Sequence, residues 1–183
     1  MGFQDSEVSV IIRRKDALTQ ERVQEVLGYN PNSGKFARRD HYKGLARSGK
    51  EPGTISQYGY RVIGVDWFKY LAHRLAWLHV HGCWPENEID HINGDRLDNR
   101  IDNLREATHA ENGQNAKMWV TNTSGFKGVY YCKGQRGYKQ WKAEFSSNGK
   151  MIRVGYFKTK EEAGEAIKIA RAEYHGEFAN HGA

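Results

Sequence analysis

Residues 88–95 read Glu88-Ile89-Asp90-His91-Ile92-Asn93-Gly94-Asp95. This window concentrates carboxylate, imidazole and carboxamide groups in a few positions. Because Asn and Gly both tolerate a positive φ, the Asn93-Gly94 pair predicts a turn that folds residues 88–92 back against residues 101–105. We therefore expect a hairpin in this part of the chain.

A helix is expected directly after the hairpin. Thr108 and Glu111 have the spacing of a capping box, and the helix that they predict carries Asn112 near its start. The hairpin and the helix together would gather four polar side chains, those of Asp90, His91, Asn103 and Asn112.

The charge of the chain is unevenly distributed. The 183 residues carry a formal net charge of +6, and residues 122–156 hold seven basic side chains and one acidic side chain, Glu144. A local basic surface of this kind favours an anionic partner. The length suits one large domain or two small ones.

Composition also excludes several classes of protein. The two cysteines, Cys83 and Cys132, form no CxxC pair, so neither a disulfide framework nor a cysteine zinc site is expected. The sequence shows no signal peptide and no run of about 18 apolar residues, so we expect an intracellular protein without membrane contact.

Before the hairpin, the apolar spacing predicts mixed secondary structure. A short helix is expected between Thr19 and Gly28, strands near residues 60–65 and 67–70, and a helix over residues 72–80 that supports the hairpin from behind. The tryptophans of this region are expected in the core: Trp67, Trp77 and Trp84.

The last third of the chain has a different pattern. Three strands separated by glycine-rich turns are expected, at residues 126–133, 139–146 and 150–157. A capping box at Thr159 and Glu162 begins a final helix. The fold class is thus α+β, and the chain ends in a three-stranded antiparallel sheet plus one helix, with a cationic open face.

The polar cluster allows two interpretations. Asp90 and Asn112 offer hard oxygen ligands, which suit Mg²⁺ or Mn²⁺ and not zinc, and His91 suits a base for an attacking water. Asp90 and His91 would point to opposite faces of a regular strand, so a strand end or a turn must redirect one of them. In the alternative interpretation, these residues cluster only because Asp, Asn and Gly form turns.

Four segments resemble the HNH endonucleases, specifically the phage and intron-encoded homing type: His73-Arg74-Leu75, Asp90-His91-Ile92-Asn93-Gly94-Asp95, Asp102-Asn103-Leu104-Arg105 and Glu111-Asn112. The likeness covers roughly residues 18–118 and implies a ββα-metal fold. By this resemblance Asp90 and Asn112 bind the metal ion, and His91 acts as the base.

The resemblance also implies roles for three more side chains. Asn103 would hold the loop, Arg74 would pair with the scissile phosphate, and His73 would either act in the site or pack against the hairpin. Many relatives carry histidine at the position of Asn112, which leaves the metal ion open between Mg²⁺ and Mn²⁺.

Residues 122–180 resemble the AP2 DNA-binding domain, in segments such as Gly125-Phe126-Lys127-Gly128-Val129-Tyr130 and Val154-Gly155-Tyr156-Phe157. Such domains lay the outer sheet face into the major groove of DNA. By this resemblance eight side chains would contact DNA: Tyr130, Lys133, Arg136, Lys139, Lys142, Glu144, Lys150 and Arg153. Tyr130 and Cys132 stand where plant domains carry arginine, so base specificity does not carry over.

These features predict a metal-dependent DNA endonuclease of homing type, monomeric, acting on double-stranded DNA in the cytoplasm of a phage-infected host. A nuclease domain is expected at residues 1–118, a linker at 119–124 and an AP2-like domain at 125–181. The alternatives are a non-catalytic DNA-binding regulator and a phage accessory protein, each on a nuclease-derived fold.

Overall fold

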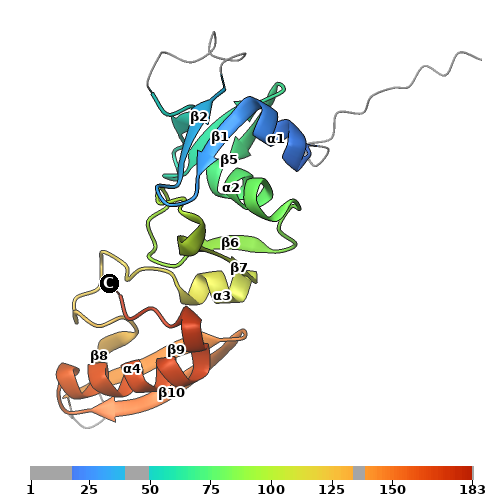
Figure 1. The fold of residues 1–183 in the computed structure, drawn as a ribbon. Coiled ribbons are helices and arrows are strands. Elements are labelled where there is room, and N and C mark those ends of the chain that lie inside the picture. The colour runs from blue at the N-terminus through green and yellow to red at the C-terminus, as the bar shows by residue number, and fades with distance from the viewer. Residues whose placement is uncertain (1–17, 40–49, 134–138, 183) are drawn as a thin grey trace, which may run out of the picture.

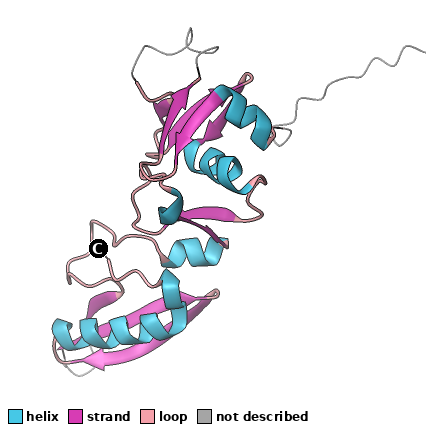
Figure 2. Ribbon diagram, in the orientation of Figure 1, coloured by secondary structure: helices cyan, strands magenta, loops and turns pink. Residues whose placement is uncertain are grey.

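The computed structural model describes residues 18–39, 50–133 and 139–182. The elements follow one another along the molecule in chain order, from α1 near one end to the C-terminal sheet and helix at the other (Figure 1). The secondary structure is mixed, with small antiparallel sheets (Figure 2). No helix among the described residues is long and apolar enough to cross a membrane.

The described N-terminal elements are α1 Gln20–Val26, β1 Leu27–Asn30, β2 Lys35–Arg38, β3 Thr54–Ile55, β4 Arg61–Val65, β5 Phe68–Leu71 and α2 Ala72–His81. β1 pairs with β2, while β3, β4 and β5 form a second sheet. Thr19 caps α1 by accepting a hydrogen bond from the Arg22 amide. Gly82 ends α2 in the left-handed region, at φ 77°.

One cluster of buried apolar side chains joins these elements to the central hairpin. Val23 of α1, Ile63 of β4 and Leu75 of α2 are each 0% exposed. Ile89 and Leu104, which lie on the two strands of the hairpin, belong to the same cluster. Burying side chains of this size stabilises the fold by about 1.5–3 kcal/mol each. The predicted support of the hairpin by α2 is therefore present.

The central part contains β6 Glu88–His91, the 3-10 helix η3 Ile101–Asn103, β7 Leu104–Ala107 and α3 His109–Gln114. β6 and β7 form the expected antiparallel hairpin. The second strand begins later than predicted, because η3 occupies the first three of its expected residues. α3 begins with the predicted capping box, in which Thr108 and Glu111 exchange side-chain and backbone hydrogen bonds.

The C-terminal elements are β8 Val129–Lys133, β9 Lys139–Ser147, β10 Lys150–Phe157, α4 Lys160–His175 and the 3-10 helix η5 Gly176–Phe178. β9 lies between β10 and β8, and α4 runs across one face of the sheet (Figure 1). Ala143 and Phe145 of β9 pack with Ile167 of α4 in a second, separate apolar cluster. The three-stranded sheet with one helix is as predicted from the sequence.

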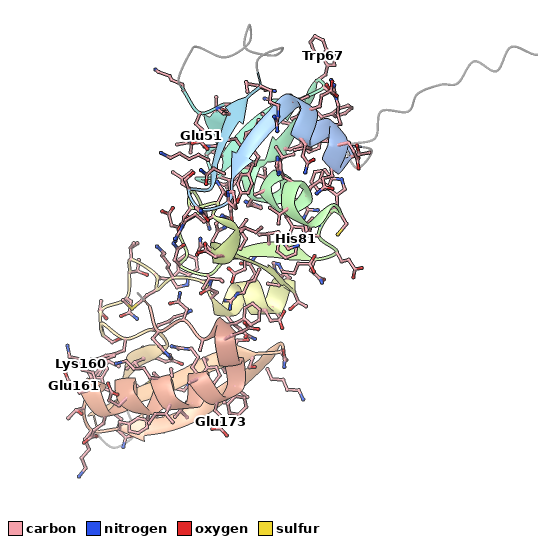
Figure 3. All side chains as sticks on the ribbon, viewed as in Figure 1. Glu51, Trp67, His81, Lys160, Glu161 and Glu173 are labelled. Carbon is pink, nitrogen blue, oxygen red and sulfur yellow. The ribbon has the colours of Figure 1, made fainter. Side chains whose placement is uncertain are left out.

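The expectation that Trp67 lies in the core is wrong. Trp67 is 94% exposed at the turn between β4 and β5 (Figure 3). Asp66 and Trp67 both have positive φ, 46° and 73°, the pattern of a two-residue hairpin turn. Trp67 is itself a turn residue between the end of β4 and the start of β5, and its side chain points outward into solvent.

Candidate active site

Asp90 lies in β6 and is 4% exposed. Arg105, its partner across the hairpin, donates from Nε and Nη2 to Asp90 Oδ2 at 2.9 and 2.8 Å. Asn115, just after α3, donates its Nδ2 to both carboxylate oxygens at 2.9 Å. A buried carboxylate is tolerated only with such partners. Asp90 is thus held by one cation and one amide.

Asn112, the second predicted ligand, contacts a different carboxylate. Its Nδ2 donates to Glu88 Oε2 at 2.5 Å, and His109 Nδ1 lies 2.9 Å from Glu88 Oε1. Glu88 and Asp90 are two residues apart in β6, so their side chains point to the same face of the strand. Asn112 and Asn115 are one helical turn apart, so their two amides lie against these two carboxylates in succession. The structure brings Asn112 to the face that bears Asp90 but pairs it with Glu88.

His91 is turned toward α2, on the opposite side of β6 from Asp90. It is 4% exposed, and its Nε2 lies 3.3 Å from Asn99 Oδ1. The ring of His73 meets it edge-on, with 5.0 Å between centroids. Burial lowers the pKa of His91, an effect that the hydrogen bond to Asn99 partly opposes. The imidazole is therefore neutral near pH 7, the form that accepts a proton.

The two residues of the strand thus face opposite sides without a turn to redirect either. From the sequence, one of the two side chains was expected to turn so that both lie on the same face. In the structure, Asp90 and His91 lie on opposite faces of the hairpin. α3 and its C-terminal neighbour Asn115 cover the Asp90 face, and α2 covers the His91 face. Strand alternation therefore separates the acidic and the imidazole halves of the site.

Asn103 bridges the two ends of the loop that joins β6 to η3. Its Oδ1 accepts from the Asn93 amide at 3.0 Å, and its Nδ2 donates to Asn93 Oδ1 at 3.1 Å and to the Asp98 carbonyl at 2.8 Å. Its own carbonyl accepts from the Ile92 amide at 2.9 Å. These bonds are what a residue that holds the loop would make.

His73 and Arg74 have different surroundings. His73 is 5% exposed and packs against the rings of His91 and Tyr60. Burial, together with the charges of His91 and Arg74, lowers the pKa of His73 to about 3. Arg74 is partly exposed and donates to the Asn87 carbonyl at 3.4 Å. Of the two roles expected for His73, the contacts describe the packed one.

Acidification is expected to destabilise the protein through His73. The folded pKa of about 3 lies below the ordinary 6.5, so the unfolded chain takes up the proton first as the pH falls. The stabilisation is complete above the ordinary pKa and declines as the pH falls toward the folded pKa, by about 3 kcal/mol near pH 4.5. Urea unfolding at neutral pH and near pH 4.5 measures the loss of unfolding free energy. His73→Gln should flatten this dependence, whereas His81→Gln, which changes an exposed histidine at the end of α2, is the control and should leave it unchanged.

The segment that follows α4 packs onto both partners of the buried carboxylate. Arg105 donates from Nη1 to the Glu177 carbonyl at 2.8 Å, and the Phe178 ring centroid lies 3.7 Å from the guanidinium carbon. Asn180 donates to the backbone and side-chain oxygens of Asn115 at 2.9 and 3.2 Å. The C-terminal part is therefore joined to the hairpin at the site itself.

Comparisons with known proteins bear directly on this arrangement. Residues 70–114, which include α2, the hairpin and α3, match the sequence model of the HNH endonucleases. Protein 3.8 of Escherichia phage T7 is 34% identical over 110 residues, which cover 58% of this chain and 86% of the phage protein. The chain belongs to the HNH endonuclease family. No solved structure gives a significant match.

An HNH domain implies a phosphodiester hydrolase with DNA as its substrate. The predicted HNH resemblance is confirmed in this form, and the phage relative agrees with the predicted phage connection. The homing type and the AP2 likeness of the C-terminal sheet have no counterpart in these matches and stay predictions.

HNH endonucleases typically use a divalent metal ion. Within the described residues, no group of three or more His, Cys, Asp or Glu side chains is arranged to hold one. The oxygen atoms present still suit a hard cation. Both Arg105 bonds fall on Asp90 Oδ2, while Oδ1 takes one bond from Asn115. Magnesium keeps several waters, so Asp90 Oδ1 and the carboxamide oxygen of Asn112 fit a site of this kind.

The open face of the C-terminal sheet carries only some of the predicted DNA contacts. Strand register places Tyr130, Lys142 and Tyr156 in one row, followed by Glu144 beside Arg153. Lys142 Nζ lies 2.5 Å from Glu144 Oε2, and its side chain is 15% exposed, so its charge is largely compensated. Arg153 is 60% exposed and lies 3.8 Å from the same carboxylate.

The remaining predicted contacts were expected near the turns of this sheet. Lys150 is exposed at the start of β10. Arg136 and the side chains of Lys133 and Lys139 lie outside the described part of the structure. Four residues that surround the site were not predicted from the sequence, because each makes its contact through the tertiary fold: Glu88, Asn99, Arg105 and Asn115.

Proposed function

We propose that this protein is a metal-dependent DNA endonuclease of homing type in which His91 is the general base and Asp90 with Asn112 holds the metal ion. The observation that carries the proposal is the state of two neighbouring residues in β6. Asp90 is a buried carboxylate beneath α3, and His91 is a buried neutral imidazole facing α2. The hairpin supplies the anionic ligand and the base from opposite faces of β6, so the proposal requires one phosphodiester to reach both around the strand end, where His91 is the last residue.

The chemistry assigned to the chain is hydrolysis of a phosphodiester bond. His91 takes a proton from water, the water oxygen bonds to phosphorus, and the bond to the leaving oxygen breaks. A divalent ion held by Asp90 and Asn112 would supply positive charge that stabilises the developing negative charge. Asn103 keeps the loop closed, and Arg74 binds the scissile phosphate through its partly exposed guanidinium.

We assign residues 1–118 to the nuclease domain, 119–124 to a linker and 125–181 to an AP2-like domain that selects the site. The open sheet face supports this division, because it presents aromatic and charged side chains on a surface that α4 does not cover. Aromatic rings and an exposed arginine are suited to base edges and phosphates. The partner is then double-stranded DNA.

Arg153→Ala is expected to weaken specific DNA binding by about 1–3 kcal/mol. The reason is that the Arg153 side chain is more exposed on the open sheet face than that of Lys142, at 60% against 15%. Competition binding with specific and random duplexes measures the change. Lys168→Ala, which removes an exposed cation from α4 on the covered face, is the matched control and should leave specificity unchanged. Equal losses in both variants would show that the sheet face does not read DNA.

Metal-dependent scission tests the proposed function as a whole. The full chain is incubated with DNA from its source, once with Mg²⁺ and once with a chelator, and the ends are mapped on each strand. Cleavage at defined positions in the Mg²⁺ sample alone is expected, and the strand map distinguishes a nick from a double-strand break. Specific binding without metal-dependent scission would instead favour the non-catalytic regulator.

A further inference from the structure

Asn99 is a buried polar residue beside the imidazole of His91, and the HNH resemblance assigns it no role. It is 1% exposed, and its Oδ1 lies 3.3 Å from His91 Nε2. Its Nδ2 donates to the Leu97 carbonyl at 3.3 Å. This second bond fixes the orientation of the carboxamide, so that the oxygen and not the nitrogen faces the imidazole.

The backbone at Asn99 is held by residues that lie about 70 positions earlier in the sequence. The Tyr29 hydroxyl donates to the Asn99 carbonyl at 2.7 Å, and the Ile101 amide donates to the Pro31 carbonyl at 3.3 Å. Gly34, at φ 68°, approaches so closely that a Cβ there would lie 2.5 Å from the Asn99 carbonyl carbon. The turn between β1 and β2 therefore presses directly on the segment that carries the carboxamide.

We propose that Asn99 is the positioning residue of the general base. This inference rests on the proposed function of His91. An amide oxygen can only accept a hydrogen bond, so Nε2 of the facing imidazole must carry the proton. The neutral ring then has its lone pair on Nδ1, which is the atom that takes the proton from water.

The same contact favours the product of that proton transfer. Once Nδ1 is protonated, the ring is a cation, and its Nε2–H bond to Asn99 becomes charge-assisted and therefore stronger. His73, edge-on at 5.0 Å, and Tyr60, at 6.0 Å between centroids, limit rotation of the ring about its own axis. Asn99 thus selects the tautomer, and its two aromatic neighbours restrict the orientation.

Two variants of the full chain test this role, Asn99→Asp, which keeps an acceptor oxygen, and Asn99→Leu, which has a similar volume and no acceptor. The first measurement is the ¹H–¹⁵N spectrum of the ring of His91. An exchange-protected Nε2–H signal is expected in the wild type and in Asn99→Asp, and its loss is expected in Asn99→Leu. This readout needs neither metal ion nor DNA.

The second measurement is Mg²⁺-dependent cleavage. Asn99→Leu should lower kcat about 10- to 100-fold with KM unchanged, the size of effect seen when a partner that orients a functional histidine is removed. Asn99→Asp should retain activity within about tenfold of the wild type. Tyr29→Phe, which removes the hydroxyl bond to the Asn99 carbonyl without touching His91, should weaken the Nε2–H protection to a lesser degree.

The outcomes separate this inference from the function on which it rests. Persistence of the protected signal in Asn99→Leu overturns the positioning role, as does an equal loss of activity in both variants with an equal fall in Tm. If the wild type shows the signal and does not cut DNA, the proposed function has failed, and the spectra alone decide whether Asn99 orients the ring.

Discussion

His91→Ala is expected to reduce the rate of strand scission by a factor of about 10²–10⁴, which is the range that general base catalysis contributes. DNA affinity should be unchanged. The imidazole is buried against α2, and burial keeps it neutral at pH 7, so its loss removes the proton acceptor and no exposed positive charge. Single-turnover cleavage and equilibrium binding on the same duplex measure the two quantities.

His109→Ala is the matched control for this result. His109 also carries an imidazole and also hydrogen-bonds a residue of β6, Glu88, but its side chain is 94% exposed. The His109→Ala variant should cleave DNA at a rate close to that of the wild type. If His109→Ala were as inactive as His91→Ala, or if His91→Ala cut normally, the assignment of the base would be wrong.

A chain that ends at Met118 is expected to lose both its site preference and part of its stability. The first loss follows from the missing sheet, and the second from the missing segment after α4, which holds Arg105 and Asn115 against Asp90. Without that segment the guanidinium loses the ring beneath it. Competition binding and the urea unfolding midpoint distinguish the two effects.

Phe178→Ala in the full chain isolates the second effect, because the sheet face stays intact. Phe178 is 9% exposed and stacks on Arg105, so its removal should cost about 3–5 kcal/mol in unfolding free energy without changing site preference. Ile169→Ala is the control, because Ile169 is 70% exposed on α4. This substitution should change the unfolding free energy little. A truncated chain with full stability would show that the C-terminal segment does not support the site.

Local signals in the sequence predicted the fold well. Thr19, Thr108 and Thr159 each cap the helix that was expected to follow, since a capping interaction depends on residues within one turn. The predicted strand over residues 139–146 carries Ala143 and Phe145 on the face under α4, because alternate residues of a strand point to the same side. These features need no knowledge of how distant segments pack.

The environment of the site could not be predicted in the same way. The pairing of Asp90 with Arg105 depends on hairpin register, and its contact with Asn115 depends on how α3 lies on β6. The bond between His91 and Asn99 depends on the path of a loop. Trp67 was misplaced because apolar character alone does not reveal that a turn falls on it.

Whether the protein is a metal-dependent nuclease is decided by the rate at which the purified full chain converts supercoiled DNA containing its site to nicked or linear product, in Mg²⁺ and in chelator. Conversion is expected in Mg²⁺ alone, and it should be lost in Asp90→Asn, which removes the anionic ligand while retaining the shape of the side chain. Conversion at an unchanged rate by Asp90→Asn, or none by the wild type that binds the site, would contradict the proposed function.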